Sequence, residues 1–232
     1  MTVTLDAPSS PPPARASWAR PVIVVLAAVG LLLFGAAAGL LLRLPGCSAA
    51  LAVPAADSVD VGFAQDMSVH HQQAVQMASL ERDQTTEPVL HQLAFDIETS
   101  QLQQIGRMQG WLSLWGASAL PTGGHMAWMA EAPGHAHAAT TPSGAVATMP
   151  GMASPEQLRA LRQATGPQRD VLFLQLMLRH HEGGASMLDY AAEHATVPEV
   201  RNLASQMLRT QTSESDYLRQ LLIERGGTPL PL

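Results

Sequence analysis

Two pairs of adjacent histidines, at positions 70–71 and 180–181, are the residues in this 232-residue sequence best suited to chemistry. Each pair has a methionine three residues before its first histidine and another seven residues after it. Imidazole and thioether without thiolate form a soft-to-borderline ligand set that favours copper, especially Cu(I). Zinc would bind through histidine alone, leaving the methionines to pack. The predicted metal ligands are His70, His71, Met67, Met77, His180, His181, Met177 and Met187.

A second interpretation makes the same histidines ordinary residues of a helical core. A buried polar group without a partner is costly, so buried histidines are usually neutral and hydrogen-bonded. Gln101 and Gln211 stand where they could serve His70 and His180, which would leave a structural or interaction module. A third interpretation is a pH sensor, because a buried histidine must become charged on acidification. The repetition of the pair at equivalent positions favours a shared metal site.

More histidines and methionines occur between residues 117 and 153, among many glycine, proline and alanine residues. This segment has no evident core to fill, so we expect a long, exposed crossover between two halves of the protein. A flexible His/Met tract is typical of low-affinity metal collection, and the alternative is a linker that happens to be rich in methionine. Its candidate ligands are His125, Met126, Met129, His135, His137, Met149 and Met152.

Catalytic sites and nucleic-acid binding are not predicted. Di-iron bundles use Glu-x-x-His pairs, but no glutamate stands three residues before any of the paired histidines, and Glu81 is replaced by Ala191 in the second half. There is no H-E-x-x-H motif, and no inward serine or cysteine accompanies the histidines as a nucleophile. The net charge of −6 argues against nucleic acid as a partner. We therefore predict a protein that is not an enzyme.

The two histidine pairs belong to an internal duplication. A shift of 110 residues aligns 60–116 with 170–226 without a gap, and fifteen of the 57 aligned pairs are identical. Chance would give about three or four identities and would not place one histidine pair on the other. Such self-similarity at a fixed spacing indicates two copies of one supersecondary unit.

Each copy is predicted to be a helical hairpin. Apolar residues recur at three- and four-residue spacing over 60–84 and 88–116, and again over about 168–195 and 197–225. Pro88 and Pro198 suit first helical turns, with Thr86 and Thr196 as predicted caps. A hairpin cannot bury its apolar face alone, so the fold class is all-α, an antiparallel four-helix bundle over 57–227. A capping box at 154–157 predicts one more short helix.

The N-terminal part of the chain has the properties of a membrane anchor. Residues 22–42 contain no charge, and a helix of that length spans roughly 30 Å, the thickness of the bilayer's hydrocarbon core. Arg15 and Arg20 precede this run and only Arg43 follows it closely, which favours a cytoplasmic N-terminus. We expect a cytoplasmic tail over 1–20, a single anchor in the lipid bilayer over 21–43, a linker over 44–56 and a bundle outside the cytoplasm. A lipoprotein at Cys47 and a cleaved signal peptide are the alternatives.

The pattern F-x-x-x-M-x-x-H-H-x-x-(A/G)-x-x-M, followed by L-A-x-x-(I/M)-x-x-x-Q and a glycine, resembles the DUF305 family, a domain of unknown function. It occurs at 60–116 and 170–226, and MPGMASPEQL at 149–158 is also similar to that family. The resemblance implies a ferritin-like four-helix fold, export or membrane anchoring and, for some members, copper binding through His and Met. The family commonly has Glu three residues after the second-helix Gln. This chain keeps it as Glu214 but has Gln104 in the first copy.

Overall fold

The computed structural model describes residues 18–42, 53–130 and 145–232, which separate into two compact units. In the described part of the chain all the regular structure is helical apart from an isolated bridge between His125 and Val146. The helices are α1 (Ala19–Leu42), α2 (Val59–Arg82), α3 (Pro88–Leu114), the short 3-10 helix η1 (Ala127–Met129), α5 (Pro155–Gln163), α6 (Gly166–His194) and α7 (Pro198–Glu224).

The first unit contains α1, whose stretch Pro21–Gly39 is long and apolar enough to cross a membrane. None of this stretch is buried within the molecule. Its position agrees with the anchor predicted over 21–43, and a signal sequence would have the same length and composition. The alternative lipidation site, Cys47, lies outside the described residues.

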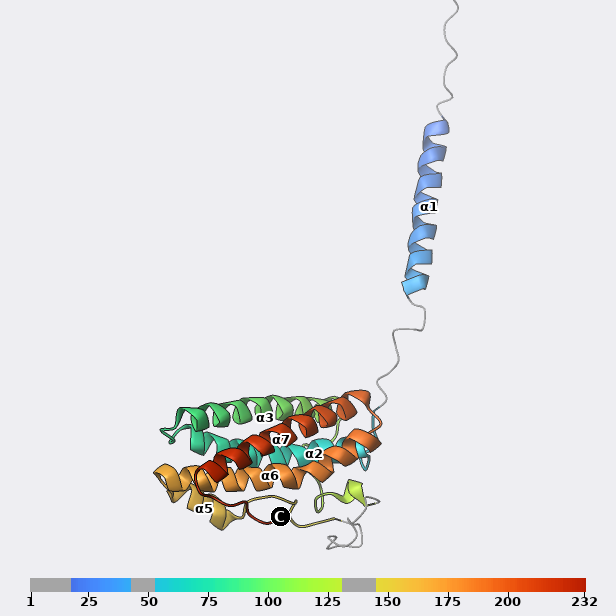
Figure 1. Cartoon of the computed structure of the whole chain (residues 1–232). Coiled ribbons are helices and arrows are strands. Elements are labelled where there is room, and N and C mark those ends of the chain that lie inside the picture. The colour runs from blue at the N-terminus through green and yellow to red at the C-terminus, as the bar shows by residue number, and fades with distance from the viewer. Residues whose placement is uncertain (1–17, 43–52, 131–144) are drawn as a thin grey trace, which may run out of the picture. The chain divides into compact units, whose positions relative to one another are not determined.

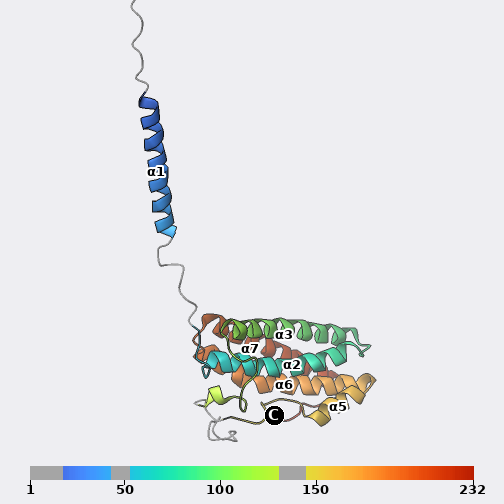
Figure 2. The same ribbon diagram turned by 180° about the vertical axis from the view of Figure 1, so that it is seen from behind.

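The second unit, Val53–Leu232, is built from the two predicted hairpins. Helix α2 packs along α3, α6 packs along α7, and the hairpins meet where α2 contacts α6. Figures 1 and 2 show α2 and α6 side by side from both directions, with α5 on the side of α6 that faces away from α3. Each hairpin ends at a glycine with positive φ, 64° at Gly116 and 71° at Gly226, a conformation that suits a helix C-terminus.

In each hairpin the first helix donates a side-chain hydrogen bond to the segment that follows the second helix, with the same spacing in both copies. The Nε2 atom of Gln65 donates to the carbonyl oxygen of Ser118 at 2.8 Å, and Gln175 donates in the same way to Thr228 at 2.8 Å. Each pair is separated by 53 residues. The duplication seen in the sequence is therefore also a duplication of structure.

The helix ends agree only in part with the predicted caps. The capping box at Ser154 and Gln157 is present, with both reciprocal hydrogen bonds formed. The prediction that Thr86 and Thr196 cap their helices is wrong, because the residue after each occupies the cap position. The hydroxyl of Thr196 instead donates to Oδ2 of Asp60 at 2.7 Å, which ties the start of α7 to the other hairpin.

The core of the helical unit consists of two apolar clusters on either side of the histidine pairs. Met67 and Met187 lie in one cluster, and Met77 and Met177 lie in the other. Because Met67 and Met77 flank His70 along α2, this histidine lies between the clusters. The first cluster is unusually rich in thioethers and contains Met67, Met108, Met126, Met129, Met149, Met187 and Met207.

The described ends of the crossover are packed on the helices, which corrects the expectation of an exposed tract. Asp66 on α2 is buried and accepts three hydrogen bonds, from Nδ1 of His125 at 2.6 Å, from the Met126 amide at 2.7 Å and from Nε1 of Trp128 at 2.8 Å. Met126, like Met129 and Met149, has almost no exposed surface because the first core cluster encloses it. His135 and His137 lie outside the described residues.

The other end of the crossover passes over α2 and α6 as a short strap (residues 149–153). The side-chain amide of Gln73 on α2 pairs with the backbone of Ala153, donating to its oxygen at 3.0 Å and accepting from its amide at 2.6 Å. Gly151 meets Gly183 of α6 so closely that a Cβ built on Gly183 would lie 2.5 Å from Gly151 Cα. The strap therefore covers one face of the crossing between the two hairpins.

Candidate metal centre

The four paired histidines lie in the interior at the crossing of α2 and α6. All four are at most 1% exposed. The rings of His70 and His180 come from different hairpins and lie 3.8 Å apart between centroids, tilted by 32°. The ring of His71 lies 6.4 Å from that of His70, and the ring of His181 lies 6.3 Å from that of His180. The two repeats thus bring four imidazoles into one region, as the duplicated sequence predicts.

Each of these rings has an oxygen partner for Nε2. The Nε2 atom of His70 lies 3.3 Å from the Pro150 carbonyl oxygen in the strap, and that of His180 lies 3.0 Å from the carbonyl oxygen of His70. A carbonyl oxygen can only accept, so Nε2 carries the proton and donates. In the neutral ring, Nδ1 then keeps its lone pair.

The outer two rings are held from the second helix of each hairpin. Nε2 of His71 lies 2.7 Å from Oε1 of Gln104, and Nε2 of His181 lies 2.8 Å from Oε2 of Glu214. Both partners stand 33 residues after their histidine. The Gln104/Glu214 difference between the copies is visible in the sequence, but the role of these two side chains in orienting the rings is not predicted from it. Their equal spacing from the histidines was the available signal.

The second ring nitrogen is unsatisfied at all four positions. Nδ1 of His70, His71, His180 and His181 is buried and has no hydrogen-bond partner among the described residues. The amide of Gln101 likewise makes no hydrogen bond there, so the predicted pairing of this glutamine with a core histidine is wrong. Native proteins rarely bury several unpaired polar atoms together, and such a group calls for an explanation such as an ion.

Gly184 on α6 has no side chain, so the inner ring of His70 packs close beside it. A Cβ built on Gly184 would lie 3.0 Å from Cε1 and 3.6 Å from Nδ1 of His70, and 3.7 Å from Oε1 of Gln211. This oxygen is also buried without a partner within the described chain. The space beside Gly184 is therefore bordered by unsatisfied nitrogen and oxygen atoms.

Burial also keeps three of these histidines neutral. Desolvation is the main cause that lowers the pKa of His70 to about 4 and that of His71 to about 3. Desolvation, followed by the charge of His70, holds the pKa of His180 well below its ordinary value of 6.5. At neutral pH the rings of His70, His71 and His180 are therefore uncharged, which is the state in which imidazole binds a metal.

The donor set does not form a ready-made zinc-type cage. Across residues 18–42, 53–130 and 145–232, no three His, Cys, Asp or Glu side chains are arranged to hold a metal ion. The predicted thioether ligands are nevertheless all in the core, since Met67, Met77, Met177 and Met187 are fully buried. Imidazoles supplemented by thioethers suit a soft ion better than a hard one.

Comparison with known proteins places this chain in a family. The model of the domain of unknown function DUF305 matches residues 60–222, which is more than half of the sequence. The chain belongs to the DUF305 family. The match spans both hairpins and the crossover between them. No curated protein matches the sequence.

Two solved DUF305 structures resemble this chain. The crystal structure of a DUF305 protein from Streptomyces coelicolor has 40% sequence identity and a TM-score of 0.68, covering 77% of this chain and 100% of that one. A DUF305 fragment from Deinococcus radiodurans has 31% identity and a TM-score of 0.56, covering 72% and 96%. These two relatives share the helical unit of this DUF305 protein.

A third similar structure is CopM in its Cu(I)-bound form. It has 23% identity and a TM-score of 0.52, covering 71% of this chain and 96% of that one. Structures of CopM bound to Cu(II) and to Ag also match. At this level of identity, the likeness to this DUF305 chain is one of fold.

Proposed function

We propose that this DUF305 protein binds copper at the crossing of its two hairpins and serves to sequester the metal or hand it on. His70, His71, His180 and His181 would supply imidazole nitrogen, and the four predicted methionines would supply thioether sulfur. The observation that carries the proposal is the set of four buried Nδ1 atoms, each without a partner, on rings whose Nε2 atoms are hydrogen-bonded.

This arrangement fits a metal-binding site because the second nitrogen of a ligating histidine usually donates to a carbonyl or carboxylate oxygen. That outer hydrogen bond fixes the tautomer and the orientation of the ring. Four such bonds account for every Nε2 atom and leave every Nδ1 atom available. The copper- and silver-bound forms of the similarly folded CopM support a soft metal, and zinc is the weaker alternative.

We also propose where the site is located. Residues 21–43 would anchor the chain in the bilayer as a single pass, with the N-terminus in the cytoplasm and the helical unit outside it. The Streptomyces coelicolor relative, named as a candidate secreted protein, supports an extracytoplasmic helical unit. In this proposal the helical unit is a ferritin-like four-helix bundle that binds metal and has no catalytic activity.

The test is a titration of the full chain in detergent with Cu(I), and separately with Zn(II), against a competing chelator. We expect Cu(I) to bind more tightly than Zn(II). Cu(I) binding weaker than about 10 μM, or about 7 kcal/mol of binding free energy, would remove the proposal. Combined His70→Leu and His180→Leu should weaken Cu(I) binding at least about tenfold while the chain stays folded.

The matched control is His91→Leu, which removes an exposed histidine from α3 and should leave the affinity unchanged. The same double variant distinguishes metal binding from the alternative, in which the histidines are purely structural residues of the core. A structural role predicts that the wild-type chain gains no thermal stability from Cu(I). A binding role predicts a metal-dependent rise in melting temperature that the double variant loses.

A further inference from the structure

The two halves of the metal centre differ in how they meet the solvent. On the outer side of the second hairpin, a cavity of about 170 Å³ lies between α6 and α7 and is lined by His181 and Gln211. Ala185, Thr212 and Ser215 also line it. At the positions equivalent to these three, the first hairpin has the larger apolar residues Val75, Leu102 and Ile105.

The charges at the two positions differ as well. Glu182 and Asp216 stand at the rim of the α6/α7 cavity, and Glu214 contacts His181. The equivalent residues in the first hairpin are uncharged: Gln72, Gly106 and Gln104. One carboxylate, Glu98, does belong to the first-hairpin equivalents, and Arg82 neutralises it in an ion pair. Carboxylates in a narrow cleft attract cations and raise their rate of association.

Exposure decreases steadily from the rim of this cavity to its base. Asp216 has 76% of its side chain exposed and Glu182 has 28%, whereas Ser215 and Gln211 are buried and the His181 side chain is 0% exposed. Oε1 of Gln211 and Nδ1 of His181 are both buried without a hydrogen-bond partner in the described structure. The cavity thus leads from surface carboxylates to unsatisfied ligand atoms.

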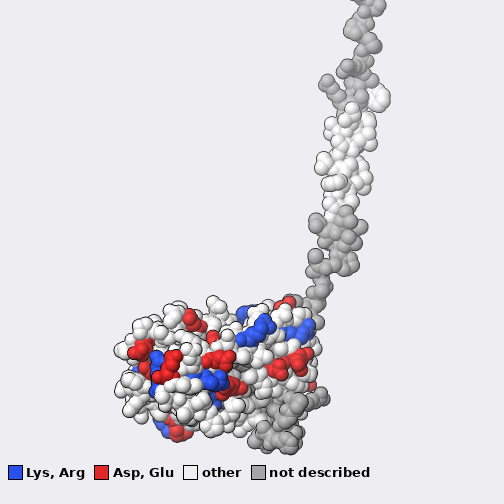
Figure 3. All heavy atoms as spheres, viewed as in Figure 1, with Lys and Arg blue, Asp and Glu red and all other residues white. Residues whose placement is uncertain are grey.

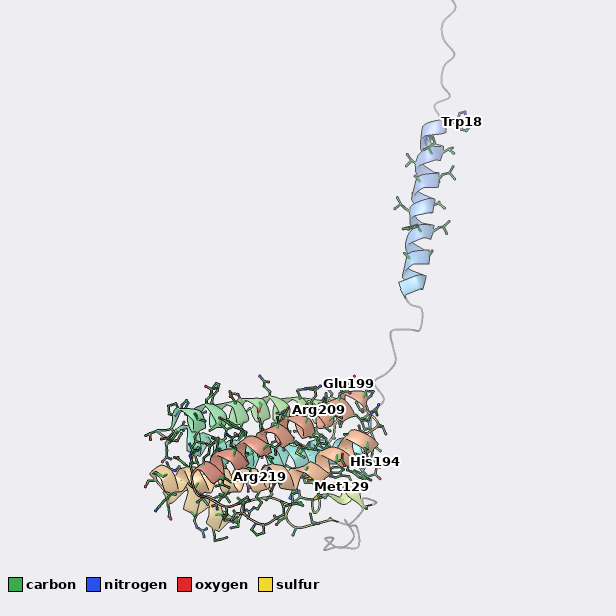
Figure 4. All side chains as sticks on the ribbon, in the orientation of Figure 1. Trp18, Met129, His194, Glu199, Arg209 and Arg219 are labelled. Atoms are coloured by element: carbon green, nitrogen blue, oxygen red, sulfur yellow. The ribbon has the colours of Figure 1, made fainter. Side chains whose placement is uncertain are left out.

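Arg219 sits across the rim. One of its nitrogens pairs with Glu182 and another lies 3.0 Å from Oδ1 of Asp216. Figure 4 places Arg219 where α7 passes over α6, and Figure 3 shows basic and acidic side chains close together on this face. The first hairpin has Gln109 at the equivalent position. The guanidinium therefore both narrows the opening and offsets the charge that would attract a cation.

We propose that metal ions reach the histidines through the α6/α7 cavity, past Glu182 and Asp216 to His181, and that Arg219 restricts this passage. The proposal rests on the proposed copper site and names the path by which metal ions enter that site. The strap closes the α2/α6 face by backbone contact at Gly151 and Gly183. The α6/α7 side instead offers a cavity with carboxylates at its rim and one of the four rings at its base.

The test measures loading and release rates of Cu(I) for the full chain in detergent, using bathocuproine disulfonate as the coloured donor and acceptor. Ala185→Trp fills the cavity and should slow both loading and release several-fold. Its dissociation constant should stay the same, because a barrier on the path acts equally on both directions. Arg219→Ala should load several-fold faster. Arg209→Ala removes an exposed charge from the same helix and should load like the wild type.

The outcomes separate this route from the site itself. A wild-type chain that binds no Cu(I) overturns the proposed function and the route with it. Unchanged loading and release in Ala185→Trp, with Cu(I) still bound, overturns the route and leaves the site standing. If Ala185→Trp does not fold, Arg219→Ala decides alone: loading at the wild-type rate overturns the passage, and faster loading than in Arg209→Ala supports it.

Discussion

At the scale of single residues, the two copies of the site differ most in what holds the outer rings. His181 donates to a carboxylate, Glu214, whereas His71 donates to a neutral amide, Gln104. A carboxylate behind a ligating histidine makes the ring a stronger donor to the metal, and loss of such a partner typically costs 10–100-fold in affinity. The second half of the centre should therefore bind metal more tightly than the first.

This difference predicts the effect of exchanging the two partners. Glu214→Gln should weaken Cu(I) binding by about 10–100-fold, because the second half then resembles the first. Gln104→Glu is the matched variant and should strengthen binding, since it gives His71 the same partner as His181. Competition with a chelator at equilibrium measures both changes. If neither variant alters the dissociation constant, these side chains do not act on bound metal.

At the scale of the elements, the strap depends on one close contact between backbones. Gly151 has a φ of 78° and crosses α6 at Gly183, where a Cβ would lie 2.5 Å from Gly151 N and from the Pro150 carbonyl carbon. Backbone atoms cannot move aside as the end of a long side chain can. Only glycine at position 183 lets the strap reach the position where Pro150 accepts from His70.

Gly183→Ala should therefore destabilise the protein by about 1–3 kcal/mol, the usual cost of overpacking. Gly110→Ala is the control, because Gly110 lies in α3 and a Cβ there would meet nothing within 4 Å. It should stabilise the chain by up to about 1 kcal/mol through helix propensity alone. Urea denaturation of the full chain in detergent measures both. If Gly183→Ala lowers the free energy of unfolding by no more than Gly110→Ala raises it, the strap moves away readily and the close contact is not required.

The helical hairpins and the meeting of the histidines could be predicted because a duplicated pattern with a helical period constrains both. The strap and the three hydrogen bonds that Asp66 accepts could not be predicted, because each joins segments that lie far apart in the sequence. Asp66 and Gln73 have Leu176 and Gly183 at the equivalent positions, so the repeat gave no sign of either contact. The predicted exposure of the crossover methionines is wrong for Met149, because nothing in the local sequence shows that this residue fills a core formed by other segments.

At the scale of the whole molecule, buried ionisable groups make the stability of the fold depend on pH, in opposite directions at acid and at alkaline pH. Burial raises the pKa of the Glu81 carboxyl to about 8, and the neighbouring Asp170 adds to the rise against the opposing charges of Arg169 and Arg225. Both Glu81 oxygens lack a donor among the described residues, and a proton on Glu81 allows it to donate to Asp170. The folded state therefore holds this proton more tightly than the unfolded chain.

The sign of each effect follows from the folded and unfolded pKa values. Because the folded pKa of Glu81 is raised, its contribution is fully present below about 4.5 and is lost as the pH rises through about 8. The folded pKa values of His70 and His71 are lowered, so their contribution is present above about 6.5 and is lost as the pH falls through about 4 and 3. His180 acts in the same direction. Three histidines outweigh one carboxyl below pH 6.5, so stability without metal should be greatest near that value.

Urea denaturation of the metal-free chain should show the free energy of unfolding falling on both sides of this pH. The fall toward low pH is the acid limb, and the fall toward high pH is the alkaline limb. The alkaline limb should fall by at most about 1.4 kcal/mol per pH unit, the limit for one group, and the acid limb should be steeper. Glu81→Gln should flatten the alkaline limb, since glutamine keeps the shape and cannot ionise, whereas Glu193→Gln on the exposed surface of α6 should leave it unchanged. The acid limb should persist in both variants because the histidines cause it. An alkaline limb that survives in Glu81→Gln would place its origin elsewhere in the molecule.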